Sequence, residues 1–362
     1  MTLDLVLVGF GHVARRFVRL LSDERAALAH AGIRCQIVGV ATARHGCLLA
    51  PTPLDADVLL AAVESGAALP DGAGRERLSN AGALLDRLAA LPSGTPRIVI
   101  ETTPLDIRGG QPAVDYIGRA FAAGAHVITA NKGPVAFAYT SLSEMARDAG
   151  RLFRFEAVVM DGIPIFSLVR ETLPAITITG FSGVLNSTTN FALDEMARGR
   201  TLDEALDTMR AAGIAEADPS LDVDGWDSAA KAAALMNVLM AADTTPLAIA
   251  RQGIAGVTPE RVTAAVESGR RLKLVARAHR TGNAVVGTVG VEEVERASPL
   301  GLLDGQANAL VLETDLLGSL TITQGAGDLT MTAYALLSDL FDIARHVRRA
   351  RAPSSPAVTD HA

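Results

Sequence analysis

Residues 3–14 read Leu-Asp-Leu-Val-Leu-Val-Gly-Phe-Gly-His-Val-Ala, and they predict a strand, a glycine turn and the start of a helix. Leu3 to Val8 is an apolar run typical of a strand buried in a parallel sheet. The residues from His12 to about His30 are predicted to form a helix. Between them, Gly-x-Gly-x-x-Ala at 9–14 provides a tight turn and a close backbone approach to a pyrophosphate. A turn of purely structural use is the alternative, but the strand–turn–helix context favours a dinucleotide site.

The N-terminus of that helix is the expected phosphate site. Free N–H groups and the helix dipole both favour negative charge there. The residues predicted to contact the cofactor at this turn are Gly9, Phe10, Gly11, His12 and Val13.

The end of the second predicted strand, 36–41, bears on which cofactor is used. An Asp or Glu at this place usually accepts a hydrogen bond from the ribose of NAD, and none is present. Arg44 and Thr42 instead suit a 2′-phosphate, Arg44 through charge-assisted hydrogen bonds. We therefore expect NADP to be preferred, with NAD as the other possibility; an ordinary exposed loop arginine is the alternative for Arg44.

Further strands at 97–101 and 126–129 alternate with helices, while about 44–95 is expected to hold loops and short helices. This alternation predicts an α/β, Rossmann-type doubly wound parallel sheet. Ligands bind at the carboxyl ends of such strands. Thr102 and Thr103 after one strand, and Asn131 and Lys132 after the next, should therefore lie near the nicotinamide. The alternative for Lys132 is a surface lysine in a turn.

After Gly150 the pattern indicates a second, α+β domain with a mixed sheet. Strands are predicted at 151–159, 176–185, 284–294, 309–312 and 318–323, with helices at 201–212 and 226–242. A last helix at about 329–349 should pack back on the first domain. The expected domains are 1–150, completed by 324–350, for the cofactor, and 151–323 for substrate binding and dimerisation. The tail at 353–362 is expected to be disordered.

Composition argues against several classes of protein. A net charge of −7 disfavours nucleic-acid binding, which needs clustered Lys and Arg. The sequence lacks the run of about 18 apolar residues that predicts a membrane span, and its N-terminal residues lack signal-peptide features. Two cysteines, Cys35 and Cys47, cannot form a disulfide framework or a four-ligand zinc site. We therefore expect a cytoplasmic protein that binds a small molecule.

An acidic stretch at 213–231 is the candidate substrate site. If a helix starts at Trp226, Asp227 and Lys231 stand four residues apart on one face, with Asp224 as a plausible N-cap. The residues after Lys231 are apolar, so the helix should be buried and Lys231 needs a partner. A paired, desolvated lysine can exchange a proton near neutral pH, as alcohol dehydrogenation requires, and the other acids suit an ammonium group. Spacing alone favours an ordinary helix ion pair.

The same stretch resembles the homoserine dehydrogenase motif D-P-x-x-D-[LIV]-x-G-x-D-x-x-x-K. The matching residues are Asp218, Pro219, Asp222, Val223, Gly225, Asp227 and Lys231. Four further segments resemble the family in the same order: the fingerprint at 9–14, 129–134, 183–190 and 324–327. The resemblance implies NAD(P)-dependent interconversion of L-homoserine and L-aspartate 4-semialdehyde in threonine, methionine and isoleucine biosynthesis. It also implies a homodimer, paired through the sheet of the second domain.

Residue roles follow from this resemblance. Lys231 would exchange the hydroxyl proton with Asp227 beside it, and Lys132 would assist at the junction of cofactor and substrate. The residues implied to bind substrate are Glu216, which would hold the amino group, Asp222, Asp218 and Thr188. Gly325 would lie at the cofactor.

The resemblance extends to a loop that binds a monovalent cation in the family, mostly through main-chain carbonyls. The matching residues are Glu156, Val159, Asp161 and Ile163, which suggests Na⁺ or K⁺. Asp161 departs from the small residue often found there, and Ser187 replaces a common glycine.

A short form without an aspartokinase or ACT domain is expected. Two alternatives stay open: a dehydrogenase of another small hydroxy or semialdehyde substrate, and a non-catalytic NADP-binding sensor.

Overall fold

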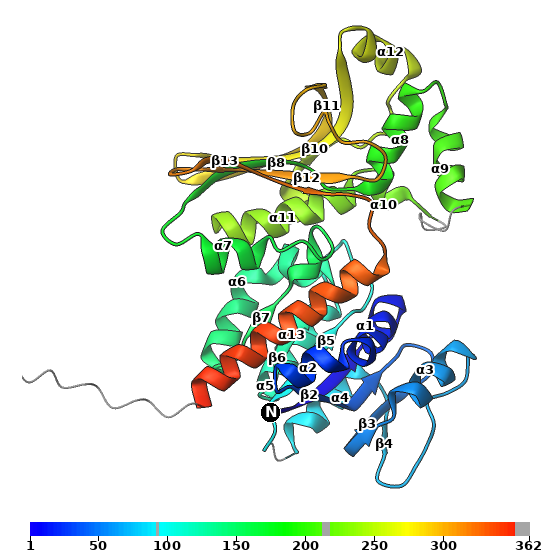
Figure 1. The fold of residues 1–362 in the computed structure, drawn as a ribbon, viewed down its shortest axis with the longest axis vertical. Helices are drawn as coiled ribbons and strands as arrows, with labels where there is room; N and C mark the ends of the chain where they lie inside the picture. Colours follow the sequence, from blue (N-terminus) through cyan, green and yellow to red (C-terminus); the bar gives the residue numbers. More distant parts are fainter. Residues whose placement is uncertain (92–93, 212–217, 352–362) are drawn as a thin grey trace, which may run out of the picture.

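A computed structural model describes residues 1–91, 94–211 and 218–351, so Glu216 and the predicted tail at 353–362 lie outside the described residues. One sheet lies in the lower half and the other in the upper half of the view, with helices between and around them (Figure 1). The predicted fold class is confirmed. No helix within the described ranges is both long and apolar enough to cross a membrane.

The first sheet contains seven strands in the order β4-β3-β2-β1-β5-β6-β7. Its parallel strands are β1 (Thr2–Val8), β2 (Arg34–Ala41), β5 (Arg97–Glu101), β6 (His126–Thr129) and β7 (Phe153–Arg154). The helices of this part are α1 (His12–Asp23), α2 (Arg25–His30), α3 (Ala56–Glu64), α4 (Ala81–Ala89), α5 (Ala113–Ala122) and α6 (Lys132–Asp148). The last helix, α13 (Leu329–Arg351), returns to this part and packs against α1 and β6.

The structure differs from the sequence prediction at two places in this sheet. The expectation of only loops and short helices at about 44–95 was wrong, because β3 (Cys47–Leu54) and β4 (Glu76–Leu78) add antiparallel pairings there. Pro51 and Pro53 obscure β3, and they are tolerated because they lie beyond its pairing with β4 and beside an irregular register with β2. The strand predicted within 151–159 is β7, which joins the first sheet and not the second.

The second sheet has the order β13-β12-β8-β10-β11-β9. Its strands are β8 (Ile178–Val184), β9 (Ala250–Arg251), β10 (Arg270–Thr281), β11 (Ala284–Glu295), β12 (Asn308–Thr314) and β13 (Gly318–Gln324). Every pairing is antiparallel except that of β9 with β11. The helices are α7 (Phe166–Thr172), α8 (Ser187–Ala197), α9 (Leu202–Ala211), α10 (Ser220–Val223), α11 (Trp226–Met240) and α12 (Pro259–Glu267). Short 3-10 turns span Glu156–Val158 and Pro246–Ala248.

Helix α11 joins the two parts of the molecule. It packs on one side against β8, β10 and β11 and on the other against α6, so it lies between the second sheet and the first part (Figure 1). Ala229, Ala230 and 232–234, in the middle of the helix, are fully buried. A helix that is apolar on all sides is expected to be enclosed, and small side chains let its neighbours approach closely.

A buried lysine explains why β10 was not predicted. Lys273 interrupts the apolar pattern of the strand, and its side chain is fully buried. Its ammonium group donates to Asp194 Oδ1 at 2.8 Å, to Asn190 Oδ1 at 2.6 Å and to the Leu303 carbonyl at 2.8 Å. Asp194 also accepts the Gly305 N–H at 2.6 Å. This network ties β10 and α8 to the loop before β12.

Replacing Lys273 with Met should destabilise the protein, because the Asp194 carboxylate would be left buried without its cation. Breaking a buried pair in this way costs about 3–5 kcal/mol, measurable by urea or thermal unfolding. Arg277→Met on the same strand removes an exposed pair with Glu292 and should cost less than about 1 kcal/mol. Equal unfolding midpoints for the two variants would contradict this account.

Candidate functional site

The glycine turn after β1 is packed against the end of β5. Gly9 has φ +88°, and a Cβ atom there would lie 2.8 Å from the Thr102 carbonyl carbon and oxygen. The Thr102 N–H donates to the Val8 carbonyl at 2.8 Å, and its hydroxyl donates to the Gly9 carbonyl at 3.1 Å. Only glycine therefore fits at position 9 without displacing the neighbouring strand end.

Gly11 faces open space. A Cβ atom added there would meet nothing within 4 Å, and Gly11 has an ordinary φ of −76° as the N-cap of α1. No side chain among the described residues caps this helix, so none of them competes for the N–H groups of its first turn. Phe10 is buried in the core and Val13 is half-buried, while His12 is exposed beside the turn. An open, uncapped helix N-terminus behind a tight glycine turn fits a pyrophosphate.

The loop after β2 contains Thr42 and Arg44. The Thr42 hydroxyl donates to the Gly46 carbonyl at 2.9 Å and accepts the His45 N–H at 2.7 Å, so it stabilises the turn. Arg44 is exposed, and its side chain has no ion pair or hydrogen bond within the described residues. Its guanidinium group is therefore free to bind an anion.

A carboxylate that the sequence analysis did not single out organises the next two strand ends. Glu101 is fully buried, and it accepts hydrogen bonds from the Thr103 N–H at 2.7 Å and the Thr129 hydroxyl at 2.6 Å. Burial raises the pKa of Glu101, and these hydrogen bonds oppose that effect. Asn131 follows as the N-cap of α6 and accepts the Gly133 N–H at 2.9 Å. The available signal was an acid ending an otherwise apolar strand.

Two lysines from different helices meet at one aspartate. Asp227 Oδ1 lies 3.2 Å from Lys132 Nζ, at the start of α6, and Asp227 Oδ2 lies 3.1 Å from Lys231 Nζ, one turn further along α11. The predicted contact between Asp227 and Lys231 is confirmed. Lys231 Nζ also donates to the Leu185 carbonyl at 2.5 Å.

The ion cluster shifts the pKa values of Asp227 and Lys132. Burial opposes ionisation of Asp227, but the charges of Lys231 and Lys132 outweigh it and hold the pKa of Asp227 well below its usual range. The charge of Asp227 raises the pKa of Lys132. The prediction of Asp224 as the N-cap of α11 was wrong, because Gly225, with φ +80°, has that position and starts the helix.

Asn186 is a second residue that the sequence analysis did not single out. Its Nδ2 atom donates to Asp222 Oδ1 at 2.6 Å and to Asp227 Oδ2 at 3.0 Å. Burial raises the pKa of Asp222, as does the nearby charge of Asp227. Thr188 is buried and interacts with Asp222. Asp222, Asp227, Lys132, Lys231 and Thr188 are thus gathered around Asn186.

Two other predicted residues have no hydrogen bond or ion pair with this cluster within the described residues. Asp218 is exposed, and its carboxylate accepts the Ser220 N–H at 3.0 Å. Gly325 is exposed after β13, with nothing within 4 Å of the position of a Cβ atom. No hydrogen bond or ion pair in the described part of the chain links either residue to Asp227.

The side chains of the predicted cation loop already have partners. The Glu156 carboxylate accepts N–H groups of Ile165, Phe166 and Ser167, at 2.6, 2.7 and 2.8 Å, at the start of α7. Asp161, with φ +45°, accepts Gln324 Nε2 at 2.8 Å and the Thr332 hydroxyl at 3.1 Å. The described residues contain no group of three or more His, Cys, Asp and Glu side chains that could hold a metal. A monovalent cation would therefore be bound in this loop by main-chain carbonyls, including those of Val159 and Ile163.

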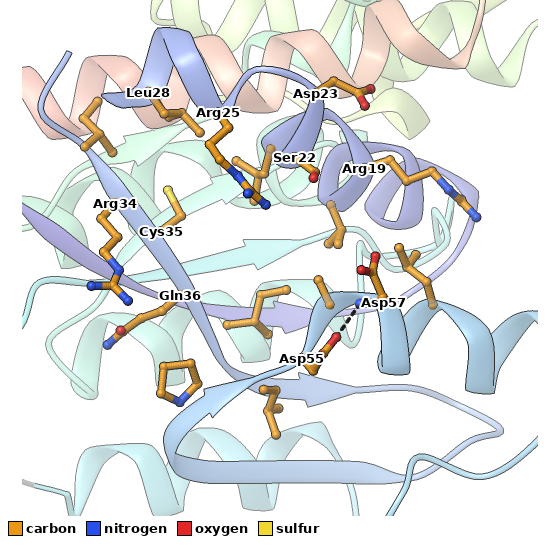
Figure 2. Close-up of a pocket in the computed structure, with 18 of the residues that line it drawn as sticks. Arg19, Ser22, Asp23, Arg25, Leu28, Arg34, Cys35, Gln36, Asp55 and Asp57 are labelled. Atoms are coloured by element: carbon orange, nitrogen blue, oxygen red, sulfur yellow. Dashed lines mark hydrogen bonds between the residues drawn. The ribbon is translucent and has the colours of Figure 1, made fainter. Parts of the chain in front are cut away.

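A cavity of about 1220 Å³ opens at the end of the first sheet where its parallel strand β2 begins (Figure 2). It lies between α1, the first residues of β2 and the start of α3, and Arg25, Arg34 and Asp57 help to line it. Because β2 runs from Arg34 to Ala41, the cavity is at the amino end of this strand, whereas the glycine turn follows the carboxyl end of β1. None of the described residues that line it is a predicted site residue.

Comparisons with known proteins agree with the motifs. Residues 9–156 match the family model "Homoserine dehydrogenase, NAD binding domain", and residues 164–341 match "Homoserine dehydrogenase". The chain is 32% identical to the NAD(+)-dependent homoserine dehydrogenase of Pseudomonas canavaninivorans, over 95% of this chain and 97% of that one. It is 33% identical to the homoserine dehydrogenase of Methanocaldococcus jannaschii, over 94% and 98%.

Among solved structures, a homoserine dehydrogenase from Thiobacillus denitrificans superposes with a TM-score of 0.81 at 27% identity. The match covers 98% of this chain and 76% of that one.

Replacing Gly11 with Ala should separate cofactor binding from folding. The new methyl group meets no protein atom, so the unfolding midpoint should stay near that of the wild type, but the methyl would occupy the space of the pyrophosphate. Affinity for NADH and NADPH, measured by titration calorimetry, should fall at least about tenfold, or about 1.4 kcal/mol. Gly94→Ala, at another open glycine remote from the turn, is the control. Unchanged affinity in the Gly11 variant would refute this placement of the cofactor.

Proposed function

The chain belongs to the homoserine dehydrogenase family, and we propose that it interconverts L-homoserine and L-aspartate 4-semialdehyde with NAD or NADP as the hydride carrier. The observation that carries this proposal is the contact of Asp227 with both Lys132 and Lys231. Lys132 starts a helix at the carboxyl edge of the first sheet, and Lys231 lies on the helix under the second sheet. An acid/base group is thereby held where the nucleotide-binding and substrate-binding parts meet.

The cofactor would be held by the turn at 9–13 together with Thr102 and Thr103, and Gly325 would approach it from the second part. A bound nicotinamide supplies the hydride acceptor. The fit rests on the close-packed Gly9 with its positive φ, the open space at Gly11 and the uncapped start of α1.

The chain's own residues would manage the proton and the amino acid. In oxidation, neutral Lys231 takes the hydroxyl proton as hydride leaves the carbinol carbon; in reduction it returns that proton. Asp227 orients Lys231 through their 3.1 Å contact, and Lys132 lies at the cofactor–substrate junction. Asp222, Thr188 and Asp218 would bind the substrate together with Glu216, which lies outside the described residues.

We propose NADP as the preferred cofactor. Arg44 follows the end of β2 and has no partner within the described residues, and a 2′-phosphate would give its guanidinium group charge-assisted hydrogen bonds. The relative from Pseudomonas canavaninivorans is NAD(+)-dependent, so the preference needs a direct comparison of the two cofactors.

Two further features are proposed on family membership. Carbonyl groups of Glu156, Val159, Asp161 and Ile163 would bind Na⁺ or K⁺, since the two acidic side chains in this loop already have hydrogen-bond partners. The active form would be a cytoplasmic homodimer paired through the second sheet.

Lys231 variants test the proton-transfer role. Lys231→Met should lower kcat with homoserine at least about 10²-fold, because it removes the acid/base group. Lys231→Arg keeps the positive charge beside Asp227 but cannot give up its proton, so it should be similarly impaired. Cofactor affinity, measured in parallel, should be unchanged in both variants. Retention of wild-type kcat by the arginine variant would overturn the role.

An Arg44 variant tests the cofactor preference. Arg44→Ala should raise the KM for NADP about tenfold, because a hydrogen bond to a charged group contributes about 1.5–3 kcal/mol, and it should leave the KM for NAD unchanged. Arg34→Ala, an exposed arginine at the opposite end of β2, should change neither constant. Equal changes for both cofactors in the Arg44 variant would argue against a 2′-phosphate contact.

A further inference from the structure

Asn186 connects the two carboxylates of the candidate site. It follows β8, is 5% exposed and is the N-cap of α8. Its Oδ1 atom accepts the Thr189 N–H at 2.8 Å, while Nδ2 donates to Asp222 and Asp227. These partners fix the orientation of the amide, because its oxygen faces a donor and its nitrogen faces two acceptors. Both N–H groups are therefore used for the carboxylates.

The two carboxylates have different partners apart from this amide. Asp227 contacts both lysines, at 3.1 and 3.2 Å. Asp222 has no ion pair with any described residue, although the charges of Asp227 and Lys231 on α11 and of Lys132 on α6 act on it. Asp222 is thus the acid whose charge is not already taken by a lysine.

We propose that Asn186 is a positioning residue that keeps the two carboxylates for two different tasks. This inference rests on the proposed function. Asn186 holds Asp222 ready to bind the substrate, and it leaves Asp227 to orient Lys132 and Lys231. The amide achieves this by binding both acids at once without adding a charge of its own.

The neutrality of Asn186 matters for substrate binding. Two aspartates and two protonated lysines carry no net charge, and the group becomes negative by one when Lys231 is neutral and ready to accept a proton. A cationic side chain at position 186 would cancel this charge and compete with the substrate for Asp222. An acidic one would add a third carboxylate to a buried pair. An amide avoids both effects.

Two variants of Asn186 keep the N-cap of α8 and change only the group that faces Asp222 and Asp227. Asn186→Ser keeps an N-cap oxygen and removes both donors, and Asn186→Asp keeps the cap and replaces the donors with a carboxylate. Losing a hydrogen bond to its charged form raises the pKa of Asp222, so the acidic limb of kcat/KM for homoserine should move to higher pH. The expected shift is about one pH unit for Asn186→Ser and more for Asn186→Asp. The KM for homoserine near the acidic limb should rise about tenfold, while cofactor affinity is unchanged.

Asn80→Ser is the control for loss of a cap amide, because Asn80 caps α4 through the same type of bond, to the Ala83 N–H at 2.9 Å, far along the chain from the acidic cluster. It should leave the pH profile unchanged. If both Asn186 variants keep the wild-type KM and pH profile and lose only thermal stability, Asn186 merely caps α8 and the proposal is wrong. If the wild-type chain does not turn over homoserine, the proposed function itself fails.

Discussion

The contact of Asp227 with two lysines is the interaction on which the rest of the site depends. Taking three charged groups out of water is costly, and the arrangement persists because each ammonium group lies about 3 Å from a carboxylate oxygen, at 3.2 and 3.1 Å. It also constrains the architecture, since Lys132 and Lys231 lie on helices from different parts of the chain. The packing of α11 against α6 brings them together, and the fully buried alanines of α11 permit that packing.

The same contact joins the two halves of the proposed reaction. Helix α6 starts directly after β6, so Lys132 lies at the edge of the first sheet where parallel strands place their ligands. Glu101 fixes the ends of β5 and β6 relative to each other by accepting hydrogen bonds from Thr103 and Thr129. On the other side, Asn186 joins the turn after β8 to Asp227. Both sides of the site are therefore built from strand ends whose positions are fixed by buried hydrogen bonds.

Local pattern predicted the features that depend on neighbours in the sequence. The glycine turn and the four-residue spacing of Asp227 and Lys231 are of this kind. Asn186 and Lys273 were not singled out because the carboxylates they bind lie far away in the sequence, and Glu101 because one of its partners, Thr129, lies 28 residues away. A buried polar residue resembles a surface residue when only its sequence neighbours are visible. Lys273 even concealed the strand around it. Family resemblance, and not periodicity, identified the reaction.

The role of Asp227 is tested most directly by the initial rate of nicotinamide reduction with L-homoserine, measured for the wild-type chain and for Asp227→Asn. This variant keeps the shape of the side chain and removes the charge that holds both lysines. We expect homoserine-dependent turnover by the wild type, a loss of at least about 10²-fold in the variant, and equal cofactor affinity in both. Equal rates in the two proteins, or no turnover of homoserine by the wild type, would contradict this expectation.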